Sequence, residues 1–324
     1  MCSTSSPFET EVDTLRKEKN DTMKDHLVKA VADGVRVYAA VTTDLVNEAI
    51  RRHGCHPVAA AALGRTMTGA LLLAANLKNR EALTVTFDGH GPLGKVTVDA
   101  TPEGFVRGYV TNPYVDLPQN AKGKIDVGGG VGTDGTVTVT RFTGLRNPVT
   151  GSAPLTDGEI ADDLTKYLYV SEQTPSSVGL GVLIGHAGEK MACIGAGGFI
   201  IQPMPDATDE TIDKLEANLK KVNSVSHMVE HGLDAKGIIA ELLQGFAVDY
   251  LTTTELAFRC PCSKERISEV LLSLGKSDLE SLIEDGHAEV CCHFCNERYQ
   301  FSKEELQAIY DKAMAHGSLN GILK

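Results

Sequence analysis

The sequence predicts an α+β protein, with an N-terminal α/β domain built on a largely antiparallel sheet, a helical linker and a small C-terminal zinc-binding domain. Three observations predict this fold class. Short strand-like runs separated by tight turns fill much of residues 83–142, an acidic stretch with helical periodicity follows Pro205, and two close cysteine pairs lie near the C-terminus. We therefore expect a mobile extension at residues 1–22, a core domain at 23–205, a linker at 206–255 and a zinc-binding domain at 256–324.

Within the core domain, apolar and turn residues predict the elements in order. Alternating apolar residues predict a strand at 35–41, and helices are expected at 45–53 and 57–77. Glycine and proline punctuate the strands that follow, which favours an antiparallel meander. These strands are expected at 83–87, 95–98, 105–110 and 136–142. A helix at 160–172 precedes two apolar, buried strands at 178–184 and 191–201.

The linker is acidic and carries narrow apolar stripes. Residues 206–255 contain four lysines against ten Asp or Glu, a net charge of −6. Ile212, Leu215 and Leu219 recur at helical spacing, and Ile238 with Leu242 begins a second stripe. Short helices are marginally stable in water on their own. We expect these helices to cover a surface of the core domain.

The final domain is expected to contain three helices and a cysteine-bearing turn. Helices are predicted at 263–274 and 277–285, a knuckle at 286–301 and a terminal helix at 302–315, where Ser-x-x-Glu is a capping signal. So few residues rarely build an adequate core. Metal binding should therefore supply much of the stability of this domain.

Four cysteines dominate the functional interpretation. Cys260 and Cys262 lie in Arg-Cys-Pro-Cys-Ser, and Cys292 and Cys295 lie in Cys-His-Phe-Cys. Zinc suits four thiolates, and a closed four-sulfur shell leaves no position for water. Only Pro261 separates the first pair, so a disulfide between those two sulfurs would close a strained, easily reduced ring. The pattern predicts zinc binding and leaves open whether the site is a scaffold or a switch.

Other ligand sets and a disulfide framework are weaker alternatives. Cys291 with Cys295 would also make a permitted ligand pair, although the apolar residue before Cys292 favours a knuckle turn that uses Cys292. His287 and His293 could coordinate a metal, but four thiolates already fill the shell. A disulfide framework is disfavoured because nothing else in the chain is typical of a secreted protein.

Composition and charge exclude several classes of function. The 324 residues carry a net charge of −12 and no tryptophan, and residues 259–306 hold six Lys or Arg against ten Asp or Glu. Nucleic acid would be repelled, so no nucleic-acid partner is expected. The N-terminus lacks a secretory signal, and Arg65 interrupts the longest apolar stretch, so no membrane partner is expected. The predicted location is the cytoplasm, where thiols stay reduced.

Two local patterns suggest enzymes but are better explained otherwise. Residues 130–135 match Gly-x-Gly-x-x-Gly, yet a strand-like Thr-Val repeat follows them, where a dinucleotide-binding loop would open a helix. A glycine-rich hairpin turn is the better interpretation. Cys55 and His56 are adjacent, and neighbouring residues rarely point at each other. The sequence therefore predicts no enzyme.

The cysteine motifs and their surroundings resemble one known family. Residues 258–266 (Phe-Arg-Cys-Pro-Cys-Ser-Lys-Glu-Arg), 271–275 (Leu-Leu-Ser-Leu-Gly) and 292–296 (Cys-His-Phe-Cys-Asn) carry the resemblance. Residues 128–130 and 171–176 also fit. The chain is similar, from about residue 25 to 310, to the 33 kDa heat-shock protein family of redox-regulated bacterial holdase chaperones. Cys291 and the N-terminal extension depart from the family pattern.

The resemblance implies a redox switch. One zinc ion per chain on reduced Cys260, Cys262, Cys292 and Cys295 would hold the inactive state. Peroxide or hypochlorite would form Cys260–Cys262 and Cys292–Cys295 disulfides, release the zinc and unfold the zinc-binding domain and the linker. The exposed apolar surface would then bind unfolding client proteins without ATP, and the active form would be a homodimer.

Two other hypotheses are compatible with a four-cysteine zinc domain. A redox-insensitive zinc-binding adaptor protein would keep its metal and its partner during oxidation. A thiol oxidoreductase using Cys292 and Cys295 would need a reactive thiol outside a filled metal shell. Metal release measured beside thiol loss distinguishes these from a holdase.

Overall fold

The computed structural model describes residues 24–315 except 79, 146, 189 and 223. The extension predicted at residues 1–22 therefore lies outside the described residues. The chain divides into two compact units, one ending at Arg259 and one beginning at Cys260.

The first unit contains two sheets, and the first of these (sheet A) has five antiparallel strands. Their order is β10-β1-β2-β9-β8. Their bounds are β1 His26–Ala32, β2 Val35–Val41, β8 Ser177–Ala187, β9 Lys190–Pro203 and β10 Asp249–Glu255. Strands β1 and β2 form a hairpin, as do β8 and β9, so residues far apart in the sequence meet where β2 pairs with β9.

The second sheet (sheet B) has six strands in the order β11-β5-β4-β3-β6-β7. Their bounds are β3 Ala82–Asp88, β4 Val96–Ala100, β5 Phe105–Val110, β6 Thr136–Phe142, β7 Val149–Pro154 and β11 Ala257–Phe258. All pairs are antiparallel except β11 with β5. The largely antiparallel sheet predicted from the turn residues is confirmed.

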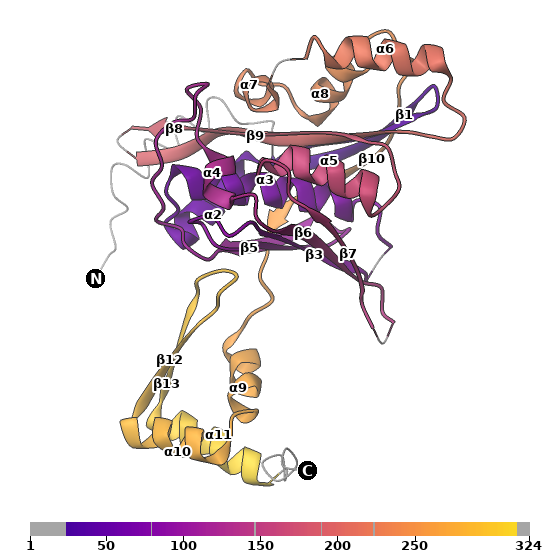
Figure 1. The fold of residues 1–324 in the computed structure, drawn as a ribbon. Coiled ribbons are helices and arrows are strands. Elements are labelled where there is room, and N and C mark those ends of the chain that lie inside the picture. Colours follow the sequence, from indigo (N-terminus) through magenta and orange to yellow (C-terminus); the bar gives the residue numbers. More distant parts are fainter. Residues whose placement is uncertain (1–23, 79, 146, 189, 223, 316–324) are drawn as a thin grey trace, which may run out of the picture. The chain divides into compact units, whose positions relative to one another are not determined.

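Helices α2, α3, α4 and α5 lie between the two sheets (Figure 1). Their bounds are α2 Thr43–His53, α3 Pro57–Ala74, α4 Val127–Val131 and α5 Ile160–Val170. Helix α3 contacts both sheets and forms the centre of the larger core. Among the described residues it is the one helix long and apolar enough to cross a membrane, and 89% of that window is buried inside the protein. Its alanines and glycines allow close packing, so its composition is that of a core helix.

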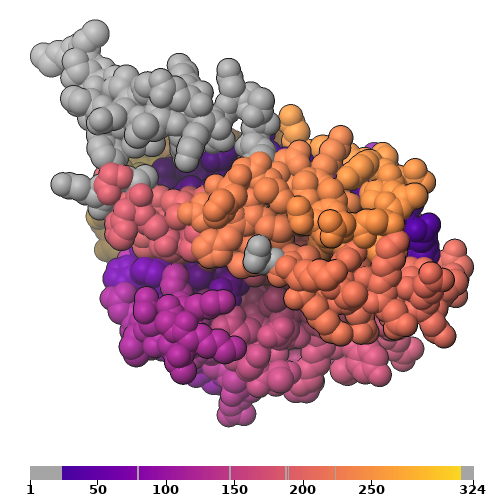
Figure 2. Space-filling view, turned by 90° about the horizontal axis from the view of Figure 1, so that it is seen from above, coloured from indigo at the N-terminus to yellow at the C-terminus, as the bar shows by residue number. Residues whose placement is uncertain are grey.

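A second helical layer covers the outer face of sheet A. It consists of α6 Asp209–Leu219, α7 Val225–Glu230 and α8 Ala235–Leu242. Side chains of Thr208 and Asp234 cap α6 and α8 by accepting backbone N–H groups. The apolar stripes pack on β1, β2 and β9 and form a core separate from that around α3. Figure 2 shows this outer layer in orange, spread over one face of the unit.

Helix α7 lies directly on glycines of the β8–β9 hairpin. A Cβ added at Gly195 would lie 2.4 Å from the carbonyl oxygen of Ser226, and one at Gly181 would lie 2.5 Å from the Ser226 nitrogen. Both contacts are with the α7 backbone, which cannot yield as a side-chain tip can. Glycine at these two positions is therefore a condition for docking α7.

The second unit is small and built around one compact core. Its elements are α9 Lys264–Leu272, α10 Lys276–Asp285, β12 His287–Cys291, β13 Arg298–Ser302 and α11 Lys303–Ala315. Strands β12 and β13 form an antiparallel hairpin. Ser302 and Glu305 cap α11 reciprocally, which confirms the predicted capping signal. The buried apolar residues are Leu271, Leu279, Ala288, Phe301, Leu306, Ile309 and Ala313.

The structure differs from the sequence-based expectations at several elements, including strands β1 and β7, which the sequence pattern does not predict. The linker at 206–255, predicted to be helical, contains α6, α7 and α8 up to Leu242 and then forms strand β10. Strand β10 lies at the edge of sheet A, and its side chains are polar or exposed. The glycine run expected to be a hairpin turn includes the short helix α4, and Gly130 and Val131 accept backbone hydrogen bonds from Leu93 and Gly91. A dinucleotide-binding loop is absent there, since β6 follows the run.

Candidate metal centre

The first cysteine pair lies in the irregular stretch between β11 and α9. Ser263 caps α9 by accepting the Arg266 N–H, and the Arg266 guanidinium donates to the Pro261 carbonyl at 2.9 Å. Proline fixes one backbone angle between the two cysteines. The start of α9 therefore holds Cys260 and Cys262 in a defined turn.

The second pair lies at the tip of the β12–β13 hairpin. The Cys292 N–H donates to the Glu297 carbonyl at 2.9 Å, and the Asn296 N–H donates to the Cys292 carbonyl at 2.7 Å. Asn296 has a φ of 58°, a left-handed conformation that asparagine tolerates better than most residues. The turn brings Cys292 and Cys295 to one side of the hairpin tip.

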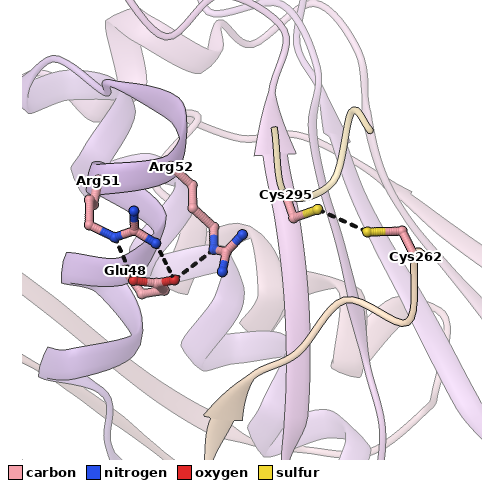
Figure 3. A network of polar contacts seen from close by, with 5 residues as sticks. All are labelled: Glu48, Arg51, Arg52, Cys262 and Cys295. Atoms are coloured by element: carbon pink, nitrogen blue, oxygen red, sulfur yellow. Dashed lines mark hydrogen bonds and ion pairs between the residues drawn. The ribbon is translucent and has the colours of Figure 1, made fainter. Parts of the chain in front are cut away.

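The four predicted cysteines meet at one point. All four sulfur atoms lie within 4.8 Å of one another. The Cys260 and Cys292 sulfurs are 3.8 Å apart, and the Cys262 and Cys295 sulfurs, which point toward one another in Figure 3, are 3.2 Å apart. These two contacts each join a cysteine of the first pair to one of the second. The cluster therefore ties the start of α9 to the hairpin tip.

The size and chemistry of the cluster fit a metal ion. Sulfurs placed about 2.3 Å from a central zinc form a tetrahedron with edges of about 3.8 Å. The Cys260–Cys292 spacing matches that edge and the Cys262–Cys295 spacing is shorter, and the four cysteines are not joined in disulfides. Four thiol sulfurs form a donor set suited to a closed, structural type of site.

The alternative ligands named from the sequence lie outside this cluster. Cys291 is exposed, and its thiol donates to the Asn296 side-chain carbonyl at 3.1 Å. His287 is exposed, and its Nδ1 lies 3.4 Å from the Asp285 carbonyl. Within the described part of the chain, His287, His293 and Cys291 are not members of the group that could hold a metal ion.

Burial shapes the protonation of the thiols. Loss of solvent raises the pKa of Cys295 well above its ordinary range, and the same cause raises the pKa of Cys262. Both groups therefore hold their protons at neutral pH in the metal-free state. A bound metal must displace those protons, so metal affinity should fall as the pH falls.

Tyr299 is a neighbour of the cluster that sequence reasoning missed. Its hydroxyl donates to the Cys262 sulfur at 3.1 Å, which partly offsets the effect of burial on the pKa of Cys262. Its ring packs against the small core of the second unit. Placing a strand at 298–302 would have brought Tyr299 to the hairpin, but its contact with Cys262, 37 residues earlier, required the folded structure.

The two described cysteines of the first unit, Cys55 and Cys193, do not form a nucleophilic site. Burial raises the pKa of Cys55 and of Cys193 to about 12, so neither thiol is a nucleophile at neutral pH. His56 Nδ1 lies 2.9 Å from an Asp116 carboxylate oxygen. The neighbouring pair Cys55 and His56 therefore does not form a thiol–imidazole site.

Comparisons with known proteins agree with the fold and the cluster. The family model described as Hsp33 protein matches residues 25–302. The 33 kDa chaperonin of Bacillus subtilis is 50% identical over 89% of this chain and 99% of its own, and that of Staphylococcus carnosus is 46% identical over 90% and 99%. The crystal structure of the 33 kDa chaperonin of Thermotoga maritima superposes with a TM-score of 0.82 at 35% identity, covering 91% of this chain and all of that one.

Fold and site together define a chaperone with a C-terminal four-cysteine cluster that can bind a metal, and not an enzyme. The chain belongs to the Hsp33 family, the 33 kDa chaperonins, which are redox-regulated holdases. The predicted resemblance, the fold class and the non-enzymatic chaperone function are confirmed.

Tyr299→Phe removes the hydroxyl that donates to Cys262 but keeps the ring. We expect the affinity for added Zn²⁺ to fall by about tenfold or more, since groups that support metal ligands commonly matter to that extent. Competition against a chromogenic chelator measures the change.

Tyr310→Phe is the matched control, because the Tyr310 hydroxyl bonds Glu280 at 2.9 Å in the same unit, away from the sulfurs. Equal Zn²⁺ affinity in the two variants would show that the Tyr299 hydroxyl has no part in the site.

Proposed function

We propose that the reduced protein binds one zinc ion per chain through Cys260, Cys262, Cys292 and Cys295 and is inactive in that state. The support is the donor set: four thiols at the spacing of a zinc–thiolate tetrahedron. Bound zinc would supply a closed shell that links the two cysteine pairs. We further propose a division of labour among a core at residues 23–205, a linker at 206–255 and a redox-switch domain at 256–324.

Oxidation would give the same sulfurs different partners. The proposed disulfides are Cys260–Cys262 and Cys292–Cys295. For each bond, two zinc-bound thiolates lose two electrons to one peroxide, which takes up two protons from solvent and becomes two waters. Both bonds are local, so neither joins the start of α9 to the hairpin tip as the present sulfur contacts do. Forming them would remove the tie between the two segments along with the metal.

The second unit has little else to hold it together. Seven buried apolar residues form its core. Its exposed ion pairs, such as Lys264 with Glu305 at 2.6 Å, contribute little to stability. Where a metal site supplies much of the folding free energy, its loss unfolds the domain. We infer that the oxidised second unit loses its structure.

The surface beneath the outer helices is the proposed client-binding face. Helices α6, α7 and α8 are short and depend on docking, because isolated helices of this length are unstable. Their release would expose two sets of apolar side chains. The sheet contributes Val28, Ala30, Val35, Val37, Phe199 and Ile201, and the helices contribute Leu215, Met228, Val229, Ile238, Ile239 and Leu242. A contiguous apolar patch of this kind binds unfolding proteins.

The oligomeric state, the client proteins and the cellular location also belong to the proposal. We propose that the activated protein is a homodimer, that its partners are unfolded or aggregation-prone client proteins held without ATP, and that it acts in the cytoplasm. The acidic charge of the linker and the four-thiol site support this function. The single observation that carries it is the meeting of all four sulfurs, from two distant segments, within 4.8 Å of one another.

A light-scattering assay with a thermally unfolding client tests the function. We expect peroxide-treated, metal-free protein to suppress aggregation and the reduced, Zn²⁺-loaded protein to do so much less. Cys262→Ser removes one sulfur of the cluster and should lower Zn²⁺ affinity. Cys291→Ser, outside the cluster, should switch like the original chain. Oxidised protein that never exceeds the reduced form, with its metal retained, would instead support a redox-insensitive adaptor.

Gly195→Ala tests whether docking of the outer helices limits activity. The added methyl would lie 2.4 Å from the Ser226 carbonyl oxygen, so α7 must move away. We expect the reduced variant to suppress aggregation at least several-fold better than the reduced original chain. Binding of a hydrophobic dye and the scattering assay both measure the effect.

Gly185→Ala is the control on the same hairpin, because its methyl meets the half-exposed side chain of Ile194, which can rotate. If both reduced variants were as inactive as the original chain while α7 lost its protection from hydrogen exchange, the covered face would not be the client-binding surface.

A further inference from the structure

One continuous segment closes an edge of each sheet. Residues 249–259, here called the strap, contain β10 and β11. Strand β10 pairs with β1 at the edge of sheet A, and β11 pairs with β5 at the edge of sheet B. The Arg259 N–H still donates to the Val106 carbonyl at 2.9 Å, and the next residue is Cys260. The strap therefore ends where the proposed metal site begins.

Side chains anchor the strap weakly. Six of the seven residues of β10 are exposed, and Leu251 is 59% exposed. The register of β10 on β1 also shifts between Lys29 and Ala30. Apolar anchoring comes from buried Leu256 and from half-buried Phe258, over whose ring the Arg52 guanidinium lies at 5.1 Å. Glu48 holds that guanidinium in turn (Figure 3). Strand β10 thus depends mainly on backbone pairing.

Both neighbours of the strap lose structure in the proposed active state. Upstream, the Lys236 ammonium group of α8 lies 5.5 Å from the Tyr250 ring centre, so α8 braces β10. Downstream, Cys260 joins the strap to the second unit. Strand β10 has few buried side chains, and in the active state the segments on both sides of it would be unfolded. Little would then oppose the conformational entropy that β10 gains when it is released. Its departure leaves β1 as the edge of sheet A.

The edge so exposed is suited to pairing with another extended chain. Strand β1 stays fixed by its full register with β2, and its apolar residues Leu27, Val28 and Ala30 are held in the sheet. Charged side chains usually protect edge strands, but the Lys29 ammonium group is engaged by the Ala75 carbonyl. An ordered edge with free backbone groups recruits extended peptides by strand addition.

We propose that the oxidised protein binds an extended segment of an unfolding polypeptide as an added antiparallel strand on β1, in the place that β10 occupies in the reduced form. This inference rests on the proposed holdase function and specifies how a client is held. Backbone hydrogen bonds do not depend on the client's sequence, and the apolar face of sheet A lies beside this edge. Strand addition would thus combine broad acceptance of clients with a defined binding position.

Two synthetic peptides of one apolar, unstructured sequence test the proposal. One has ordinary amides, and the other is N-methylated at alternate residues, which removes the donors on one edge without changing the side chains. We expect the oxidised protein to bind the methylated peptide about tenfold more weakly or worse, because several backbone hydrogen bonds are lost. Equal affinity would overturn strand addition and leave apolar contact as the mode of binding.

Hydrogen exchange locates the event on the full chain. We expect amides of β1 that face β10 to be protected in the reduced protein, to lose protection on oxidation and to regain it with the unmethylated peptide. Persistent protection of β10 in oxidised protein that suppresses aggregation overturns the strap's release but not the holdase function. Oxidised protein that fails to suppress aggregation refutes the holdase function itself. A last outcome is that, in oxidised protein without peptide, β1 is protected while β10 exchanges freely. That result would mean that a second copy of the chain occupies the edge, and it would overturn the proposal.

Phe258→Ala weakens the anchor of the strap without touching β1. We expect the reduced variant to bind the unmethylated peptide several-fold more tightly than the reduced original chain. Leu251→Ala, which changes an exposed side chain of the same segment, should leave binding unchanged. Faster exchange in β10 of Phe258→Ala without any gain in peptide binding would contradict the proposal.

Discussion

The meeting of four sulfurs from two distant segments is the constraint on which the fold of the second unit depends. All four sulfurs lie within 4.8 Å of one another, so the cluster joins the stretch before α9 to the hairpin tip, which the Tyr299 hydroxyl also links to Cys262. A metal strengthens that junction, whereas disulfides within each pair would abolish it. In the proposed switch, these four side chains would serve two exclusive bonding states, and the fold of the second unit, whose core is small, would follow the bonding state.

The two units differ in what stabilises them. This difference determines which parts of the chain would unfold when the metal is lost. The first unit buries helix α3 between two sheets and has a large apolar core that needs no metal. The outer helices are attached to this platform through a second core and through the backbone contact of α7 with Gly181 and Gly195. In the proposed switch, loss of the outer helices would expose apolar surface, while the core around α3 would persist.

Sequence reasoning recovered the elements whose signals are local. Turn residues delimited β3 to β6, and the cysteine spacing located all four members of the cluster. Strand β10 was missed because it is an edge strand whose exposed residues, such as Thr252 and Thr253, show no alternation of apolar and polar side chains. Strands β1 and β7 were also missed. The hydrogen bond of Tyr299 with Cys262 and the distances between the sulfurs depend on how distant segments meet. Spacing along the chain gives pairs of neighbours and carries no information about which sulfurs approach across the fold.

Limited proteolysis mapped by mass, performed together with a count of released metal and of remaining thiols, tests the central claim most directly. The account predicts that cleavage appears first within residues 263–315 and 209–243 as the four thiols are lost and the metal is released, while the core around α3 resists. A second unit that remains uncut and compact after its sulfurs have paired and its metal has gone would contradict the account.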